Sequence, residues 1–435
     1  MSNRKKLWFE DAERKLDPGL VEQLRNARKA DLNVTDDNKI PIIVYLKRNC
    51  NQENKDDLLK TCNVDPQNKL SKELHSINGM RGHLTPDKIK QIKDHEAIDR
   101  IFYDRVVTSY LDIACEQTGA VRVREELGLT GKGVTIAVLD TGIYPHDDLI
   151  QPTNRIVAFH DFVGGESEPY DDNGHGTHCV GNAAGNGNLS DGKYGGPAPE
   201  ASIIGLKVLD GQGSGRLSTI IEGLEWCIDH KEEHHIQIIS LSLGAPAYES
   251  FRDDPLSLAS QVAWHHGIVV CAAAGNSGPD QATISTPAID PFIITVGSTD
   301  DLNTLDRGDD YIADYSSRGP TIDSFIKPDV YAPGTNIISL LSPGSGIESE
   351  LPEMIVDDHY IQLSGTSMAT PICAGIIALL LEANPSLSPN DVKSILKATA
   401  HPVLDDTWGY IEAGSAVEMA KNYYIQPPTE AVQES

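Results

Sequence analysis

Val134-Thr-Ile-Ala-Val-Leu-Asp140 is a nearly continuous apolar run that ends in a carboxylate. Such a run is typical of a strand buried on both faces of a parallel sheet. Similar runs follow along the chain, and helical stretches separate them. This alternation predicts an α/β fold: a doubly wound, mostly parallel sheet with helices on both faces. The further expected strands span 202–208, 237–243, 267–274 and 292–296, and the expected helices span 175–184, 217–229, 256–265 and 367–382.

The chain before this run predicts a separate, smaller α+β unit with a strand, two helices and a final strand. Residues 40–46 and 101–107 have strand-like patterns. Thr85 is a suitable N-cap for the second helix, with Pro86 at its first position. We therefore divide the chain into an N-terminal extension (1–38), the small unit (39–110), a main domain (111–425) and a disordered tail (426–435).

Composition narrows the functional class. The chain has 435 residues and 39% hydrophobic residues, enough to bury a large core. Lys and Arg number 36 against 64 Asp and Glu, a net charge of −28, which argues against nucleic-acid binding. The apolar runs are shorter than the ~20 residues that a membrane helix requires, so we expect no membrane partner.

The N-terminus and the cysteines indicate the compartment. Residues 1–11 begin with basic residues but reach acidic ones before any apolar stretch, unlike a secretory signal. The seven cysteines are an odd number without a repeated CxxC spacing. We therefore expect a cytoplasmic protein with reduced thiols.

Two polar clusters bear carboxylate and imidazole groups. Asp140 lies at the carboxyl end of a strand, where active sites of parallel sheets gather. By itself it could be catalytic, a phosphoacceptor, a metal ligand or a turn former. The second cluster runs Asp171-Asp-Asn-Gly-His175-Gly-Thr-His178-Cys179. Glycines on both sides of His175 leave its ring open, as a general base requires. His175 and His178 could instead bind a metal, although the HExxH zinc pattern is absent.

Two further clusters bear a hydroxyl and an amide. Ser367, in Ser364-Gly-Thr-Ser367-Met-Ala-Thr-Pro, begins an apolar helix and could be an ordinary N-cap. It could also be a nucleophile, because its small neighbours leave it accessible and a helix N-terminus favours developing negative charge. Asn276 follows the strand 267–274. It could occupy a turn, or it could direct its amide at an oxyanion.

Asp, His and Ser in this chain order resemble the subtilases. Asp140-Thr-Gly-Ile, His175-Gly-Thr-His178 and Gly365-Thr-Ser367-Met-Ala-Thr-Pro are similar to the three signatures of that family. The resemblance spans about residues 120–425. The chain order differs from that of α/β-hydrolases and of chymotrypsin-like enzymes. The chain looks most similar to the AprX-type intracellular subtilases of bacilli, on the stretches Tyr144-Pro-His, Tyr170-Asp-Asp-Asn and Ser316-Ser-Arg-Gly-Pro.

This resemblance implies a serine endopeptidase that acts on polypeptide substrates through an acyl-enzyme. By analogy, His175 takes the proton of Ser367 and Asp140 orients the ring. Asn276 and the backbone amide of Ser367 would form the oxyanion hole. The resemblance also implies that edge segments hold an extended substrate by its main chain. The substrate-binding residues carried over are Gly213, Ser214, Gly215, Ser242, Leu243, Gly244 and Gly275.

The resemblance bears on cofactors and regulation as well. Asp148 matches a family calcium ligand, but the loop 186–194 lacks the calcium-loop pattern of the secreted enzymes. Calcium is therefore a structural cofactor candidate at Asp148 and is not required for the chemistry. Residues 39–110 lie where this family carries an inhibitory propeptide, which implies a zymogen inhibited by its own N-terminal domain. The alternative is an N-terminal domain that is retained permanently.

Two rival functions remain to be weighed. Gly128, Gly131 and Gly133 could suggest nucleotide binding, but they precede the strand, which is the wrong side for a dinucleotide fingerprint. The other rival is a non-catalytic binding protein on a protease scaffold. Such a protein would not require all three triad residues together with Asn276, so their presence in this sequence argues against it.

Overall fold

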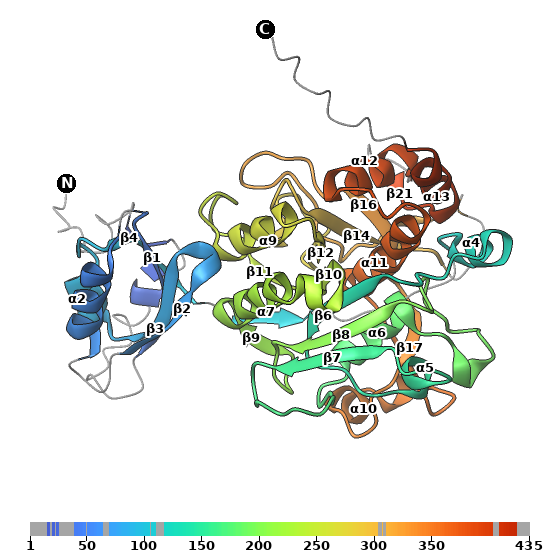
Figure 1. Ribbon diagram of the computed structural model, residues 1–435, viewed down its shortest axis with the longest axis horizontal. Coiled ribbons are helices and arrows are strands. Elements are labelled where there is room, and N and C mark those ends of the chain that lie inside the picture. The colour runs from blue at the N-terminus through green and yellow to red at the C-terminus, as the bar shows by residue number, and fades with distance from the viewer. Residues whose placement is uncertain are drawn as a thin grey trace, which may run out of the picture.

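The computed structural model describes residues 15–17, 20, 21, 23–25, 39–48, 50–63, 69–104, 106–109, 117–302, 307, 310–402 and 409–423. The expected disordered tail and most of the N-terminal extension lie outside these residues. The described residues form a small N-terminal unit, blue in Figure 1, and a larger main unit.

A long, mostly parallel sheet is the centre of the main unit. Its strand order is β20-β21-β16-β14-β12-β10-β6-β8-β7, with β15 paired to β14. All pairs from β21 to β7 along this order are parallel, which confirms the predicted doubly wound sheet. The central strands are β6 (Thr135–Asp140), β7 (Ile156–Asp161), β8 (Ser202–Lys207), β10 (Ile236–Leu241), β12 (Val269–Ala273), β14 (Ile294–Asp300) and β16 (Val330–Pro333).

Helices cover this sheet in two groups. The helix α11 contacts α6, α13 and five central strands, whereas α7 and α9 contact each other. The predicted helices are all present. The helices are α4 (Ala120–Leu127), α6 (His175–Ala184), α7 (Leu217–Asp229), α9 (Pro255–His265), α11 (Thr366–Ala383), α12 (Pro389–Thr399) and α13 (Ala413–Asn422).

Short elements complete the main unit. The strands are β9 (Ser214–Arg216), β11 (Leu243–Pro246), β13 (Ser285–Thr286), β15 (Tyr311–Ile312), β17 (Ile337–Leu340), β18 (Ile355–Val356), β19 (Tyr360–Leu363), β20 (His401–Pro402) and β21 (Gly409–Tyr410). The short helices are α5 (Asp147–Ile150), η2 (Asn188–Ser190), α8 (Lys231–His234), α10 (Gly346–Glu350) and η3 (Pro352–Met354).

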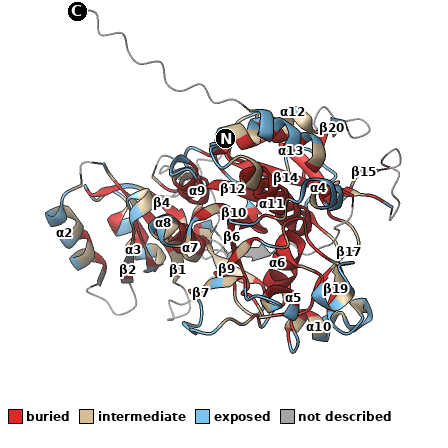
Figure 2. Ribbon diagram, turned by 45° about the vertical axis from the view of Figure 1, so that its right-hand side comes forward, coloured by how far each residue is buried: buried red, intermediate tan, exposed pale blue. Residues whose placement is uncertain are grey.

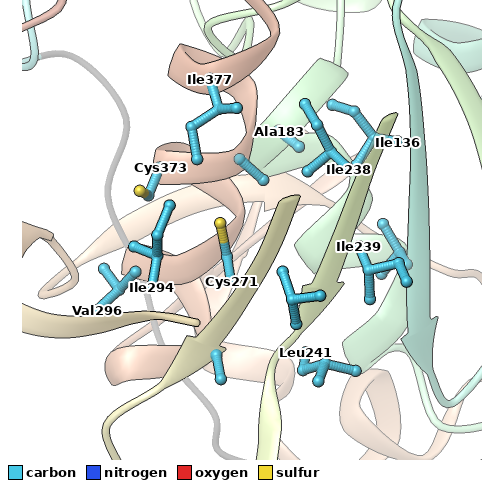
Figure 3. Packing of buried hydrophobic residues seen from close by; sticks show 14 of the residues in the cluster. Ile136, Ala183, Ile238, Ile239, Leu241, Cys271, Ile294, Val296, Cys373 and Ile377 are labelled. Carbon is cyan, nitrogen blue, oxygen red and sulfur yellow. The ribbon is translucent and has the colours of Figure 1, made fainter. Parts of the chain in front are cut away.

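The core lies between the sheet and α11. Figure 3 shows Cys373 and Ile377 of α11 beside Cys271, Ile294 and Val296 of the neighbouring strands. The helix α11 has 18 residues and is apolar enough to cross a membrane by length and composition alone. In this structure, however, 89% of it is buried inside the protein, as Figure 2 shows in red. Its apolar character therefore serves the core.

The N-terminal unit contains more strands than the pattern predicts. Its antiparallel sheet has the order β2-β3-β1-β4. Its elements are β1 (Ile40–Leu46), α2 (Gln52–Asn63), β2 (Lys69–Leu74), η1 (His75–Ile77), β3 (Gly79–Leu84), α3 (Pro86–Ile92) and β4 (Ile98–Tyr103). We did not expect β2 and β3, because charged residues and the glycines of Gly79-Met-Arg-Gly82 hide their alternation. Thr85 caps α3 through Lys88 N, as predicted.

The predicted strand over 101–107 was wrong in one respect, because it is two strands in different sheets. The strand β4 ends at Tyr103, and β5 (Val106–Ser109) pairs with the main unit instead. Between them lies Asp104, whose buried carboxylate accepts hydrogen bonds from Ser218. The break between the two strands thus coincides with a polar residue that is bound by the main unit, which an apolar pattern does not reveal.

Part of the N-terminal extension packs into the same small core. Leu16, Leu20 and Leu24 are buried against the residues of the N-terminal unit. Leu16 also forms a parallel bridge to Ile101 of β4. These described residues of the extension therefore contribute to the core of the N-terminal unit.

Candidate active site

The end of β6 and the start of α6 bring a carboxylate and an imidazole together. Asp140 is the last residue of β6, and His175 is the first residue of α6. His175 Nδ1 donates to Asp140 Oδ1 at 2.7 Å, and neither side chain is exposed. Gly174 precedes the helix with a φ of 104°, a conformation that favours glycine. This turn places the imidazole against the strand end.

The charge state of His175 depends on its partner. Burial alone lowers the pKa of this imidazole, but the Asp140 carboxylate raises it, and the net pKa lies well above its usual value. Cys179 lies beside the ring, with Sγ 3.8 Å from each ring nitrogen. Burial raises the pKa of this thiol, so it stays neutral and adds no charge.

The pair His175 and His178 does not form a metal site. His178 Nε2 lies 3.1 Å from the carbonyl oxygen of Ile361, and its Nδ1 lies 3.2 Å from Asn182 Nδ2. Burial lowers the pKa of His178 to about 3, so this ring stays neutral. Within the described part of the chain, the metal-competent group of ligand atoms is Asp140, His175 and Cys179. Two of these are already hydrogen-bonded to each other.

Ser367 lies beside these groups at the start of α11. It is the second residue of the helix, and Gly365 occupies the N-cap position, so the N-cap interpretation is wrong. Its Oγ donates to the carbonyl of Ser242 at 3.1 Å, and its own carbonyl lies 3.5 Å from Cys179 Sγ. Cys179 thus contacts both His175 and the residue that bears the hydroxyl. The N-terminus of α11 favours negative charge at this hydroxyl.

Asn276 is oriented by its neighbour in α11. Its Oδ1 accepts hydrogen bonds from the backbone N and the Oγ1 of Thr366, each at 3.0 Å. Because two donors occupy the oxygen, the Nδ2 amide is turned to the opposite side as a donor. The side chain of Asn276 therefore lies against Thr366, the residue that precedes Ser367, and its amide N–H groups remain as donors.

The two predicted edge segments hold an extended strand between them. The strand β5 pairs with β9 on one side, with Val106 opposite Arg216 and Thr108 opposite Ser214. On the other side it pairs with β11, with Ser109 opposite Leu243. These contacts are antiparallel main-chain pairings, so residues 214–215 and 243–244 of the predicted segments pair with peptide backbone in this structure. Gly213 and Ser242 adjoin these residues and are not part of the pairing.

Gly275 follows β12 at a position where no side chain fits. Its φ is 108°, and a Cβ at this position would lie 2.4 Å from Ser285 Oγ. Glycine is required here for both reasons. Ser242 lies between β10 and β11, so the predicted single strand 237–243 is interrupted at the residue whose carbonyl contacts Ser367.

Asp148 does not fit a calcium ligand in this structure. It is fully buried, and both carboxylate oxygens accept hydrogen bonds. Leu189 N donates to Oδ1 at 2.9 Å, and the Tyr360 hydroxyl donates to Oδ2 at 2.8 Å. A calcium site needs converging oxygen ligands, whereas here N–H and O–H donors converge on the carboxylate.

Sequence reasoning missed the polar groups that surround the Asp140 and His175 pair. Thr141, Asp171 and Lys207 are buried and hydrogen-bonded to one another or to the same turn. For Asp171 the sequence does contain a signal, because an acidic residue stands three positions before Gly174. The sequence analysis assigns it no role.

Comparison with known proteins agrees with this geometry. The pattern of the subtilase family of peptidases matches residues 131–422. Serine protease AprX of Bacillus subtilis is 47% identical over 366 residues, which cover 82% of each chain. Subtilisin Savinase of Lederbergia lenta is 38% identical over 273 residues, 63% of this chain and 85% of that one. The crystal structure of fervidolysin, from Fervidobacterium pennivorans, has a TM-score of 0.70 at 23% identity over 89% of this chain, which spans 62% of the fervidolysin chain.

Proposed function

The chain belongs to the subtilase family of serine peptidases, and on that premise we propose the roles of its residues and the regulation of its activity. In this proposal, Asp140, His175 and Ser367 hydrolyse peptide bonds and Asn276 stabilises the oxyanion. Residues 39–110 inhibit the enzyme until they are removed. The observation that supports the catalytic roles is the hydrogen-bonded Asp140–His175 pair beside Ser367.

The reaction follows from these positions. Ser367 Oγ attacks the peptide carbonyl while His175 Nε2 accepts its proton. Asp140 holds the imidazole in the tautomer that carries hydrogen on Nδ1 and stabilises the imidazolium. The oxyanion that forms accepts hydrogen bonds from Asn276 Nδ2 and from the backbone N of Ser367. His175 then protonates the leaving amine, and water hydrolyses the acyl-enzyme by the reverse steps. No observation favours the alternative of a non-catalytic binding protein.

The N-terminal unit supplies the strand that fills the cleft. Because β5 pairs with both edge segments, a substrate cannot use them at the same time. Asp140, His175 and Ser367 expose none of their side-chain surface. These observations support an inhibited zymogen. The bond to be cleaved is expected between Thr108 and Thr118, and residues 110–116 of that range lie outside the described residues.

Charged contacts support the position of the N-terminal unit on α7 and α9, where Figure 1 shows it. Arg81 lies 3.0 Å from Glu222, a side chain that is only 5% exposed. Arg100 lies 2.8 Å from Glu249 and 3.1 Å from Asp253. In each pair the N-terminal unit contributes the cation and the main unit the anion.

The whole chain shows the same complementarity of charge. Residues 1–110 contain 21 Lys and Arg against 18 Asp and Glu, whereas residues 111–435 contain 15 against 46. A slightly basic unit is therefore attached to a strongly acidic one. Long-range attraction favours their association, and screening by salt weakens it.

The proposal also covers the cofactor requirement and the cellular location of the enzyme. The reaction above uses side-chain and backbone groups of the chain together with water, and we expect EDTA to leave the rate per folded molecule unchanged. We place the enzyme in the cytoplasm. The six cysteines in the described residues are all free thiols, which suits a reducing compartment.

A serine-directed fluorophosphonate tests the catalytic assignment. The processed wild-type protein should hydrolyse casein, lose this activity on labelling and carry the label on Ser367. Ser367→Ala should fold, take no label and retain less than about a thousandth of the activity, since loss of a triad nucleophile costs several powers of ten. A folded Ser367→Ala protein that digests casein at the wild-type rate would contradict the assignment.

A further inference from the structure

We propose that Asp171 is a positioning residue for the reaction: through Thr141 it fixes the orientation between Asp140 and His175. This inference rests on the proposed catalytic roles of those two residues. Asp171 is only 4% exposed and lies in the loop that leads into α6.

The carboxylate of Asp171 receives donors from both sides of the triad pair. Its Oδ1 accepts from the Thr141 hydroxyl at 2.9 Å and from Gly174 N at 2.8 Å. Its Oδ2 accepts from Thr177 N at 2.8 Å and from the Thr177 hydroxyl at 2.7 Å. Asn173 N adds a weaker contact at 3.2 Å. All five groups are donors, so the site requires two acceptor oxygens, which an ionised carboxylate supplies and an amide does not.

These donors include orphan groups of the helix that carries His175. The N-cap of α6, Gly174, has no side chain to satisfy the first N–H groups of the helix. Asp171 accepts from two of these backbone groups, those of Gly174 and Thr177. A negative charge at a helix N-terminus is also stabilised by the helix dipole. Asp171 therefore acts as the cap that holds the first turn of α6 in place.

Thr141 links this cap to the catalytic carboxylate. Its Oγ1 donates to Asp171 and accepts from Gly176 N at 2.8 Å, so it bridges the end of β6 and the start of α6. Its backbone N donates to Asp140 Oδ1 at 2.7 Å, the oxygen that His175 contacts. A shift of Thr141 would therefore move Asp140 relative to the imidazole.

A buried lysine holds the other side of Thr141. Lys207 is 1% exposed, and its Nζ donates to the carbonyl of Thr141 at 2.6 Å and to Leu209 O at 3.1 Å. The same Nζ lies 2.6 Å from Asp172 Oδ1. Thr141 is thus hydrogen-bonded at its amide, its carbonyl and its hydroxyl.

The orientation of Asp140 depends on these supports. Among the described residues, its second oxygen, Oδ2, has no hydrogen-bond partner. The carboxylate is therefore held through Oδ1 alone, by Thr141 N and His175 Nδ1. A small rotation would cost little in hydrogen bonds yet would misalign the imidazole, and small misplacements of reacting groups are costly in rate.

The test compares Thr141→Val with Thr141→Ser in the processed enzyme, with rates normalised by active-site titration. Valine keeps the shape but removes the hydroxyl, whereas serine keeps the hydroxyl. We expect Thr141→Val to lower kcat by about 10-fold to 100-fold with little change in KM, because alignment is lost and binding is not. Thr141→Ser should stay within about 2-fold of wild type, since it retains both hydrogen bonds.

The pH profile distinguishes positioning from a structural role. Asp140 raises the pKa of His175, so misalignment should lower this pKa and move the acidic limb of kcat/KM to lower pH. A lower melting temperature with an unmoved acidic limb, or an unchanged kcat in Thr141→Val, would overturn the proposal. Asp171→Asn is the second variant and should give the same shift; if it does not fold, the Thr141 pair decides. Fluorophosphonate labelling of the wild type separates failure of this proposal from failure of the catalytic assignment.

Discussion

At the scale of single residues, the proposed mechanism makes activity depend on the charge state of His175. The structure places a carboxylate 2.7 Å from Nδ1, and this contact outweighs the effect of burial on the pKa of the ring. Only the neutral imidazole can accept the proton of Ser367. A raised pKa means that the ring is charged, and inactive as a base, at pH values where a free histidine is already neutral.

The pH dependence of hydrolysis follows from the direction of this pKa shift. We expect kcat/KM to rise with pH, with an acidic limb above about pH 6.5, the ordinary pKa of histidine. The measurement is the initial rate on a peptide substrate from pH 5.5 to 9, under conditions in which chemistry limits the rate. A rate that does not change across that range would exclude His175 as the base.

Asn276 is expected to act on the transition state alone. Asn276→Ala should lower kcat by ~10²–10³ with little change in KM, the loss typical of one oxyanion donor. Asn276→Asp is the isosteric comparison, and it should be at least as impaired because it replaces the donor with a negative charge. Steady-state kinetics of both variants measure this. A large rise in KM at constant kcat would instead assign Asn276 to substrate binding.

Some of these residues could be predicted from the sequence and others could not. Asp140, His175 and Ser367 each lie in a short motif, so their types and spacing were sufficient. Asp171 and Asp104 make their contacts to residues 30 and 114 positions away, and acidic residues in loops are common. The carboxylate of Asp148 was expected to bind calcium, but the Tyr360 hydroxyl that binds it lies 212 positions away.

At the scale of elements, the helices and the central strands were predictable because their apolar patterns are long. The bounds of α6 and α7 match the prediction, and glycine or polar residues mark their ends. The hydropathy pattern did not predict β2, β3 and β5 as separate strands, because their conformation depends on the strands with which they pair. For β5 these partners belong to the other unit.

The junction between β4 and β5 also caps a helix of the main unit. The N-cap residue of α7, Arg216, makes no side-chain capping hydrogen bond. Asp104 accepts from Ser218 N at 3.1 Å and from the Ser218 hydroxyl at 2.6 Å. The N-terminal unit thus satisfies donors at the start of α7, and its proposed removal would leave them without this partner.

Asp104→Ala should weaken the hold of the N-terminal unit after cleavage. Loss of a buried acceptor costs about 1–3 kcal/mol, so dissociation of the cleaved unit should become about 5-fold to 150-fold more favourable. The measurement is recovery of peptidase activity when freshly processed enzyme is diluted in series. Asp87→Ala, on the exposed side of α3, is the matched control and should behave as wild type. Equal dilution curves for Asp104→Ala and wild type would contradict the role of this contact.

At the scale of the whole molecule, the two units have the complementary surfaces on which the proposed inhibition depends. One unit presents a strand to the edge segments and cations to α7 and to the loop before α9, and the other presents the edge segments and the matching anions. Neither the strand pairing nor the ion pairs could be predicted from the sequence of either unit alone. The division of charge between the units, in contrast, can be counted from the sequence.

The most direct test of this account is the intact mass of the purified protein, measured for wild type and for Ser367→Ala. The full chain has a mass of 47.2 kDa. The account predicts that wild type loses the N-terminal unit, with the mature chain beginning between Thr108 and Thr118, and that Ser367→Ala keeps the full mass because it cannot cut itself. A wild-type protein that is fully active at 47.2 kDa, or a Ser367→Ala protein cut at the same junction when purified alone, would contradict it.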